Sequence, residues 1–186
     1  MKKIIFAMFV ASLMVACSSS KESETNEVVD EVNDATAYNF DLAKSVLTWT
    51  AFKTPDKVGV PGSFNDIKLD GNMFTINART VNSNNEIRDA KLKTFFFDNL
   101  SDSLITGSYG TISNGKIPVT IKMNGIEKTF DFDFIETDTT NVVSGSIDIL
   151  KDFSGNAALE AISIACKELH LNKTWSDVNL QVVERK

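Results

Sequence analysis

The sequence contains a single histidine, two cysteines and three prolines among its 186 residues. It also lacks a Gly-x-Ser-x-Gly sequence and a glycine-rich phosphate loop. A catalytic nucleophile and its general base would therefore have to come from outside the motifs that usually supply them. We therefore predict a protein that is not an enzyme, with no catalytic residues and no cofactor.

The scarcity of histidine and cysteine also bears on metal binding. Cys166 and His170 stand four residues apart on a predicted helix, a spacing that metal sites use. A site needs three or four ligands, and nothing in the spacing supplies the others. The favoured interpretation is a small buried thiol at Cys166 and a capping or hydrogen-bonded histidine at His170, with no metal.

An excess of positive charge is absent, because the formal net charge is −6. A nucleic-acid partner is therefore not expected. The acidic side chains include Asp131 and Asp133, which share one face of a predicted strand and are explained by solubility.

Long apolar runs are absent except at residues 4–15, which follow Lys2 and Lys3 and form a run too short to span a bilayer. The run ends in Met14-Val15-Ala16-Cys17, an ending typical of a bacterial lipoprotein signal. We predict that residues 1–16 are a signal peptide, cleaved before Cys17, and that Cys17 is the site of lipid attachment.

Residues 17–36 are polar and acidic, and they predict a flexible tether. Ser18 gives no aspartate signal for inner-membrane retention, so the expected location is the cell envelope, anchored to the outer membrane by lipid. Whether the protein faces the periplasm or the cell surface, and whether it forms a homodimer, is left open. With Cys17 acylated, Cys166 has no intramolecular partner, so the domain at 37–186 must be stabilised by its core.

A hairpin is predicted between residues 116 and 137, because two alternating segments flank Asn124-Gly125, the pair that suits a type I′ turn. Alternation gives this hairpin one apolar face. The face consists of Ile117, Val119, Ile121, Met123, Phe130, Phe132 and Phe134. It must be covered either by packed side chains or by a bound apolar ligand.

The rest of the domain alternates in the same way, which brings the number of predicted strands to about eight. Besides the hairpin, strands are predicted at 45–53, 73–81, 104–112, 142–150 and 178–182, with another interrupted at Pro61-Gly62 and shifted in parity after Phe64. Two short helices are expected, one at 83–93 with a Ser83–Glu86 capping box and one at 156–169 capped by Asn156.

The segment Asn85-Glu86-Ile87-Arg88-Asp89-Ala90-Lys91-Leu92, followed by Phe96-Phe97-Asp98, resembles the signature of the YceI-like family. Trp49, Gly62, Phe64 and Met123-Asn124-Gly125 extend the resemblance over the whole domain. The resemblance implies an all-β fold with two short helices, an extended antiparallel eight-stranded lipocalin-like β-barrel that holds a polyisoprenoid. The chain departs from the pattern at Asn99-Leu100, where tyrosine and proline are common, and at Lys91, where histidine is common.

The resemblance also implies a ligand-binding barrel interior, and Arg88 is the candidate for contact with a headgroup. The alternative for Arg88 is a solvated helix face, and the alternative for the aromatic residues is a filled core. The predicted interior consists of Trp49, Phe64, Phe74, Ile76, Leu92, Phe96, Phe97, Ile121, Met123, Phe130, Phe132 and Phe134.

The function expected from this sequence is an envelope lipoprotein that binds a long apolar lipid, such as a quinone tail or a prenyl phosphate, for sequestration or transport. The alternative from another class is a cell-surface interaction or adhesion module whose barrel is filled by its own side chains. A third and weaker alternative is an enzyme acting on isoprenoid substrates.

Overall fold

The structure is a computed structural model that describes residues 38–186. The predicted signal peptide, Cys17 and the tether lie outside the described residues. Ala35–Lys186 forms one compact unit, and all the strand pairs and both apolar clusters described below fall within it. This unit therefore contains the elements that it needs to fold on its own. None of the helices at 38–186 is long and apolar enough to span a bilayer.

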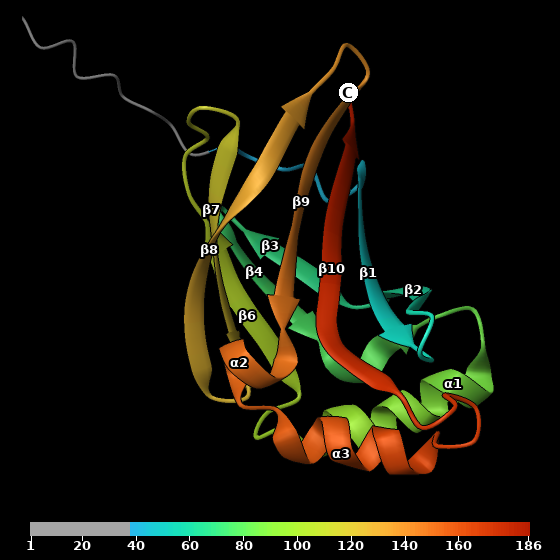
Figure 1. The fold of residues 1–186 in the computed structure, drawn as a ribbon. Coiled ribbons are helices and arrows are strands. Elements are labelled where there is room, and N and C mark those ends of the chain that lie inside the picture. Colours follow the sequence, from blue (N-terminus) through green and yellow to red (C-terminus); the bar gives the residue numbers. More distant parts are fainter. Residues whose placement is uncertain (1–37) are drawn as a thin grey trace, which may run out of the picture. The chain divides into compact units, whose positions relative to one another are not determined.

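The described residues form one antiparallel sheet of ten strands, with short helices at one end (Figure 1). Its order is β3-β4-β6-β7-β8-β9-β10-β1-β2-β5. The strands are β1 Ser45–Lys53, β2 Val58–Phe64, β3 Ile67–Asp70, β4 Met73–Asn77, β5 Val81–Asn82, β6 Leu104–Tyr109, β7 Lys116–Met123, β8 Ile126–Glu136, β9 Thr140–Asp148 and β10 Thr174–Arg185.

The sheet curls into a half-barrel, and the prediction of eight strands is wrong in its count. Two predicted strands are each broken into two. Asn65 and Asp66 separate β2 from β3, and the 3-10 turn η1 Ala78–Thr80 separates β4 from β5. The two breaks face each other, because the Asn65 N–H donates to the Thr80 carbonyl and the Asn77 N–H donates to the Asp66 carbonyl, both at 3.0 Å. Each broken strand therefore pairs with different neighbours on either side of its break and bends the sheet.

The predicted hairpin is confirmed. Asn124 and Gly125 both have positive φ, 52° and 74°, as a type I′ turn requires. The apolar face of β7 is buried along its whole length, and Asp131 and Asp133 on β8 are exposed. The alternation therefore predicted correctly which face of the hairpin points to the interior.

The first helical segment is α1 Glu86–Lys91, which continues into a π-helical turn, η2 Leu92–Phe96, and a 3-10 turn, η3 Phe97–Asn99. The predicted capping box is wrong: the Asn85 side chain accepts from the Arg88 N–H at 2.9 Å. Ser83 instead donates from its N–H and its hydroxyl to the Asp89 carboxylate, at 2.9 and 2.6 Å. The helix therefore begins later than predicted.

Two further helices follow β9, and only one of them was predicted. α2 Ile149–Phe153 lies where the sequence indicated the end of a strand, and the Asp148 side chain caps it. α3 Asn156–Ala165 is preceded by Gly155 at its N-cap, so Asn156 is not the cap, and the helix ends before Cys166 rather than at Leu169. Figure 1 shows α1 and α3 together across one end of the curled sheet, and α3 packs against η2 and η3.

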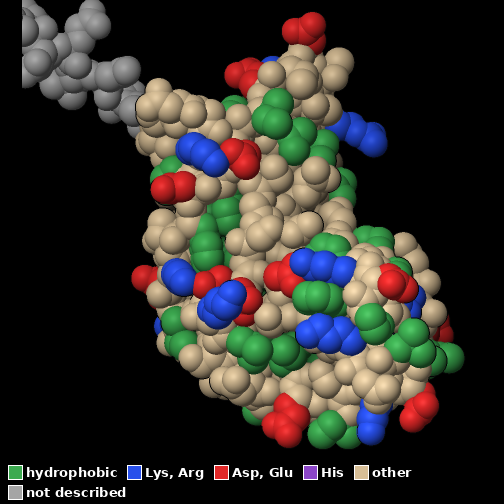
Figure 2. Space-filling model, viewed as in Figure 1, with side chains coloured by type: hydrophobic (Ala, Val, Ile, Leu, Met, Phe, Trp, Pro, Cys, Tyr) green, Lys and Arg blue, Asp and Glu red, His purple; other side chains and the backbone are tan. Residues whose placement is uncertain are grey.

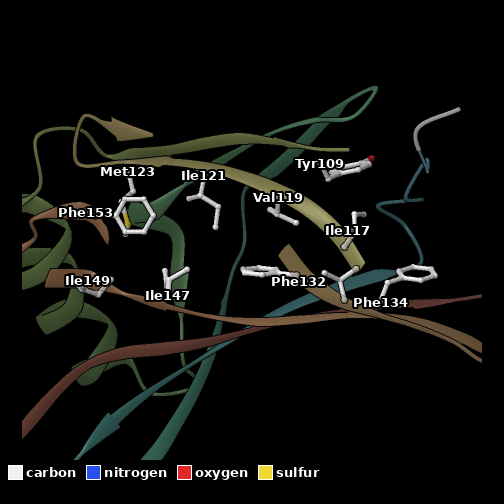
Figure 3. Close-up of a cluster of buried hydrophobic side chains, with 11 residues drawn as sticks. Tyr109, Ile117, Val119, Ile121, Met123, Phe132, Phe134, Ile147, Ile149 and Phe153 are labelled. Carbon is white, nitrogen blue, oxygen red and sulfur yellow. The ribbon is translucent and has the colours of Figure 1, made fainter. Parts of the chain in front are cut away.

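The buried side chains form two clusters. The larger one lies between β7, β8 and β9, and in Figure 3 Ile121 and Ile147 point toward one another with Phe132 beside them. The smaller one combines Trp49 and Phe97 with Ala78 and Val81. Both clusters border the same internal space, which positions the candidate site.

Candidate ligand-binding cavity

A cavity of about 540 Å³ lies inside the curled sheet. Its size falls within the roughly 300–1,000 Å³ of typical small-molecule sites. Its walls are mainly aliphatic and aromatic side chains that come from the sheet, from α1 and η2, and from α3. Ten of the twelve predicted interior residues line it: Trp49, Phe64, Phe74, Ile76, Leu92, Phe96, Phe97, Ile121, Met123 and Phe132.

Phe130 and Phe134 are the two predicted interior residues that do not line the cavity. The Phe130 ring packs against Phe153 of α2, with ring centroids 6.1 Å apart. The Phe134 ring packs against Tyr38, with centroids 5.7 Å apart. Both residues share the inward face of β8 with Phe132, but each packs against an aromatic ring from another segment and does not line the cavity.

Many lining residues were not among the predicted site residues. Val178, Leu180 and Val182 alternate on β10, so the sequence pattern that predicted this strand could also have placed them inside. Leu159 and Ile162 on α3 line the helical end, and their helical spacing was likewise visible. Ile67, Leu69 and Ile105 complete the wall at β3 and β6.

Three aromatic rings of the wall lie over glycines of the neighbouring strand. A Cβ on Gly62 would lie 2.1 Å from the Trp49 ring, and one on Gly145 would lie 2.2 Å from the Phe132 ring. Phe74 covers Gly107 in the same way, at 2.4 Å. Only glycine allows so close an approach, and each ring therefore lies against the sheet instead of projecting further into the cavity.

The end of the cavity away from the helices is bordered by Phe40 and Tyr109, whose ring centroids are 5.1 Å apart. The segment that carries Phe40 is held by Glu184, which is 5% exposed. Glu184 accepts hydrogen bonds from the Tyr38 hydroxyl, from the Asp41 N–H at 2.7 Å and from Asn141 at 3.1 Å.

These hydrogen bonds shift two pKa values. Burial, together with the Glu184 carboxylate, raises the pKa of Tyr38 to about 12. Burial alone would raise the pKa of Glu184, but the donated hydrogen bonds, led by that of the Asp41 N–H, hold it below its usual value. Glu184 is therefore a buried carboxylate that fixes this end of the cavity in its ionised form.

The helical end of the cavity carries Arg88, the predicted headgroup residue, together with Lys53, Lys91 and His170. Arg88 is half-buried and lines the cavity, so it is not on a fully solvated helix face. Cys166 is buried and also lines the cavity. His170 Nδ1 lies 2.8 Å from the Thr174 hydroxyl, and residues 38–186 contain no group of three side chains suited to hold a metal ion.

The curled antiparallel sheet, its apolar interior and the helices across one end define a mostly β half-barrel with an internal apolar cavity. More particularly, the chain has the fold of a polyisoprenoid-binding domain from Saccharophagus degradans, with a TM-score of 0.57 and 17% identity over 81% of this chain and 99% of that domain. It shares the fold of BcnA from Burkholderia cenocepacia, with a TM-score of 0.52 and 16% identity over 80% of this chain and 99% of BcnA.

The Campylobacter jejuni YCEI protein is also similar, at 22% identity over 69% of this chain and 85% of that protein, with a TM-score of 0.46. No protein-family profile and no curated protein matches the chain. The YceI-like resemblance of the sequence is thus confirmed as a shared fold.

Proposed function

We propose that the chain binds one long apolar lipid, a polyisoprenoid, in this cavity, and that it sequesters or carries the lipid without chemical conversion. The observation that carries the proposal is the unfilled apolar interior. A barrel filled by its own side chains, as the adhesion alternative requires, would not leave about 540 Å³ between its walls. The polyisoprenoid-binding domain that shares the fold supports the choice of lipid class.

The dimensions of the cavity suit an extended chain. Along β10 the lining residues run from Thr174 to Val182, which is eight residue steps. At about 3.3 Å per residue this is roughly 26 Å of wall. Burial of a hydrocarbon chain contributes about 0.8 kcal/mol per CH₂, so a chain of this length binds tightly without many polar contacts.

In the proposed setting the protein is a lipoprotein of the cell envelope, anchored through Cys17 to the outer membrane. The anchor would hold the cavity near the bilayer that supplies or receives the lipid. Metabolic labelling with a fatty-acid analogue tests this part, because a Cys17→Ser chain should lose all label while the wild-type chain keeps it.

Native mass spectrometry with lipid extraction tests the binding itself. The unit Ala35–Lys186, exported from a bacterial host, should carry a stoichiometric adduct with the mass of a polyprenyl compound. A clean apo mass that is unchanged after incubation with quinones and prenyl compounds would contradict the proposal and favour the interaction module.

Two tryptophan substitutions on β1 provide a matched pair for the same test. Leu47 lines the cavity, whereas its neighbour Val46 is 58% exposed on the other face. Leu47→Trp should reduce lipid binding at least tenfold by occupying the cavity, and Val46→Trp should leave binding unchanged. Equal binding by both variants would show that the lipid lies elsewhere.

A further inference from the structure

Every side chain that lines the cavity and carries a full charge at neutral pH is a cation. These side chains are Lys53, Arg88 and Lys91, and His170 stands beside them. Within residues 38–186, no aspartate or glutamate lines the cavity. The net charge of the chain is −6, so composition alone would favour the opposite sign.

The four residues come from three separate segments that meet at the helical end. Lys53 pairs with Thr174 across β1 and β10, and the Thr174 hydroxyl lies 2.8 Å from His170 Nδ1. From the other side, Lys91 Nζ donates to the Ala165 carbonyl at 3.4 Å, next to Cys166, whose carbonyl accepts the His170 N–H at 2.9 Å. Arg88 precedes Lys91 by three residues on α1 and shares its face.

The cations of this cluster have no acidic partners in the part of the chain that the structure describes. Seven ion pairs occur there, including Lys57–Asp177 at 2.7 Å near the same end, but none involves Lys53, Arg88 or Lys91. Burial, and then the charges of Lys53 and Lys91, lower the pKa of His170, and no carboxylate opposes them. The local potential is therefore positive, and the cluster is half-buried.

The cluster stands where the cavity meets solvent. Ile87 and Leu169 line the cavity although they are 75% and 63% exposed. In the space-filling view, charged side chains of both signs are interspersed with hydrophobic ones over this end of the molecule (Figure 2). A lipid whose chain fills the apolar interior would place its polar end among these cations.

We propose that Lys53, Arg88 and Lys91 bind a phosphate headgroup, so that the ligand is a phosphorylated polyisoprenoid and not a neutral one. The inference rests on the proposed function and specifies its ligand. Arginine binds phosphate oxygens in a bidentate manner and lysine supplies a point charge. Three cations are enough to neutralise the charge of about −1.5 to −2 on a phosphate monoester. The Phe52 and Trp175 rings line the same cavity, and apolar walls of this kind strengthen the attraction between opposite charges.

Two ligands of equal chain length separate the headgroup from the chain. Geranylgeranyl monophosphate should bind Ala35–Lys186 at least tenfold more tightly than geranylgeraniol at low ionic strength, and salt should reduce the ratio. Lys53→Gln and Lys91→Gln should each lower the affinity for the phosphate ester about tenfold and leave that for the alcohol unchanged. Lys167→Gln is the matched control, because Lys167 is exposed and does not line the cavity.

Each outcome bears on one proposal. Equal affinity of wild-type protein for the ester and the alcohol would overturn the headgroup inference and leave lipid binding intact, whereas binding of neither would overturn both. Displacement of the ester by inorganic phosphate at equal concentration would show that the cluster binds the free anion. It would overturn the proposal that the cluster binds a lipid headgroup. Loss of alcohol binding in Lys53→Gln or Lys91→Gln would show a structural role and also count against the inference.

Discussion

Replacement of Gly145 by alanine should destabilise the protein, although alanine usually stabilises a strand relative to glycine by about 0.5–1 kcal/mol. The new Cβ would lie 2.2 Å from Cδ1 of Phe132 and 2.4 Å from its Cε1. Carbon atoms pack at about 3.5–4.0 Å, so the ring must move by at least about 1.3 Å. Phe132 is buried, and its free direction is toward the cavity.

Displacement of a buried ring costs about 1–3 kcal/mol. We expect Gly145→Ala to lower the free energy of unfolding of Ala35–Lys186 by this amount and to weaken lipid binding, because the displaced ring enters the cavity. Urea denaturation measures the first effect and titration with a polyprenyl ligand measures the second.

A double-mutant cycle tests the reasoning directly. Phe132→Ala alone should cost about 3–5 kcal/mol because it removes a buried ring. In that background the Gly145→Ala change should cost almost nothing, giving a coupling energy above about 1 kcal/mol. An equal cost in both backgrounds would refute the account, since the clash with the ring would then not be the cause.

Three further predictions concern stability. Glu184→Gln should cost about 1–3 kcal/mol, because it leaves donors of a buried carboxylate poorly paired. The pKa of Glu184 in the folded protein lies below the value of 4.5 in the unfolded chain. Its contribution to the free energy of unfolding is therefore present above pH 4.5 and is lost as the pH falls through the folded pKa. In Glu184→Gln, the loss of stability at acidic pH should be smaller than in the wild type. The pKa of His170 in the folded protein is also lowered from 6.5, so the unfolded chain takes up this proton at a higher pH and stability should fall as the pH drops below 6.5. His170→Gln should remove this dependence of the free energy of unfolding on pH, and an unchanged dependence would contradict the prediction. Gly125→Ala places a side chain at φ 74° and should cost about 1–2 kcal/mol in thermal unfolding, whereas no loss would argue against a type I′ turn.

The residues that the sequence placed correctly are those governed by local periodicity. Alternation along β7 and β8 identified the inward face because a strand side chain can point only to one face or the other. Asn124-Gly125 predicted the turn because both residues readily adopt the positive φ that a type I′ turn requires. The parity shift after Phe64 also indicated an irregularity where Asn65 and Asp66 separate β2 from β3.

Other features depend on partners that are distant in the sequence, and only the tertiary structure decided them. Phe130, Phe132 and Phe134 are equivalent by pattern, yet only Phe132 lines the cavity, whereas Phe130 and Phe134 pack against Phe153 and Tyr38. The break between β4 and β5 at Ala78–Thr80 likewise had no signal in the alternation pattern.

The cationic cluster illustrates the same division. The sequence singled out Arg88 through its motif, but it gave no reason to join Lys53 with Lys91 and His170, which lie 38 and 117 residues further along the chain. Their meeting depends on β1 pairing with β10 and on α1 lying beside α3. Local sequence thus determined which way the strand side chains face and where the hairpin turns. The curling of the sheet determined which of these faces enclose a cavity and which charged side chains stand at its end. Only the tertiary structure shows this, because the curling is set by contacts between segments far apart in the chain.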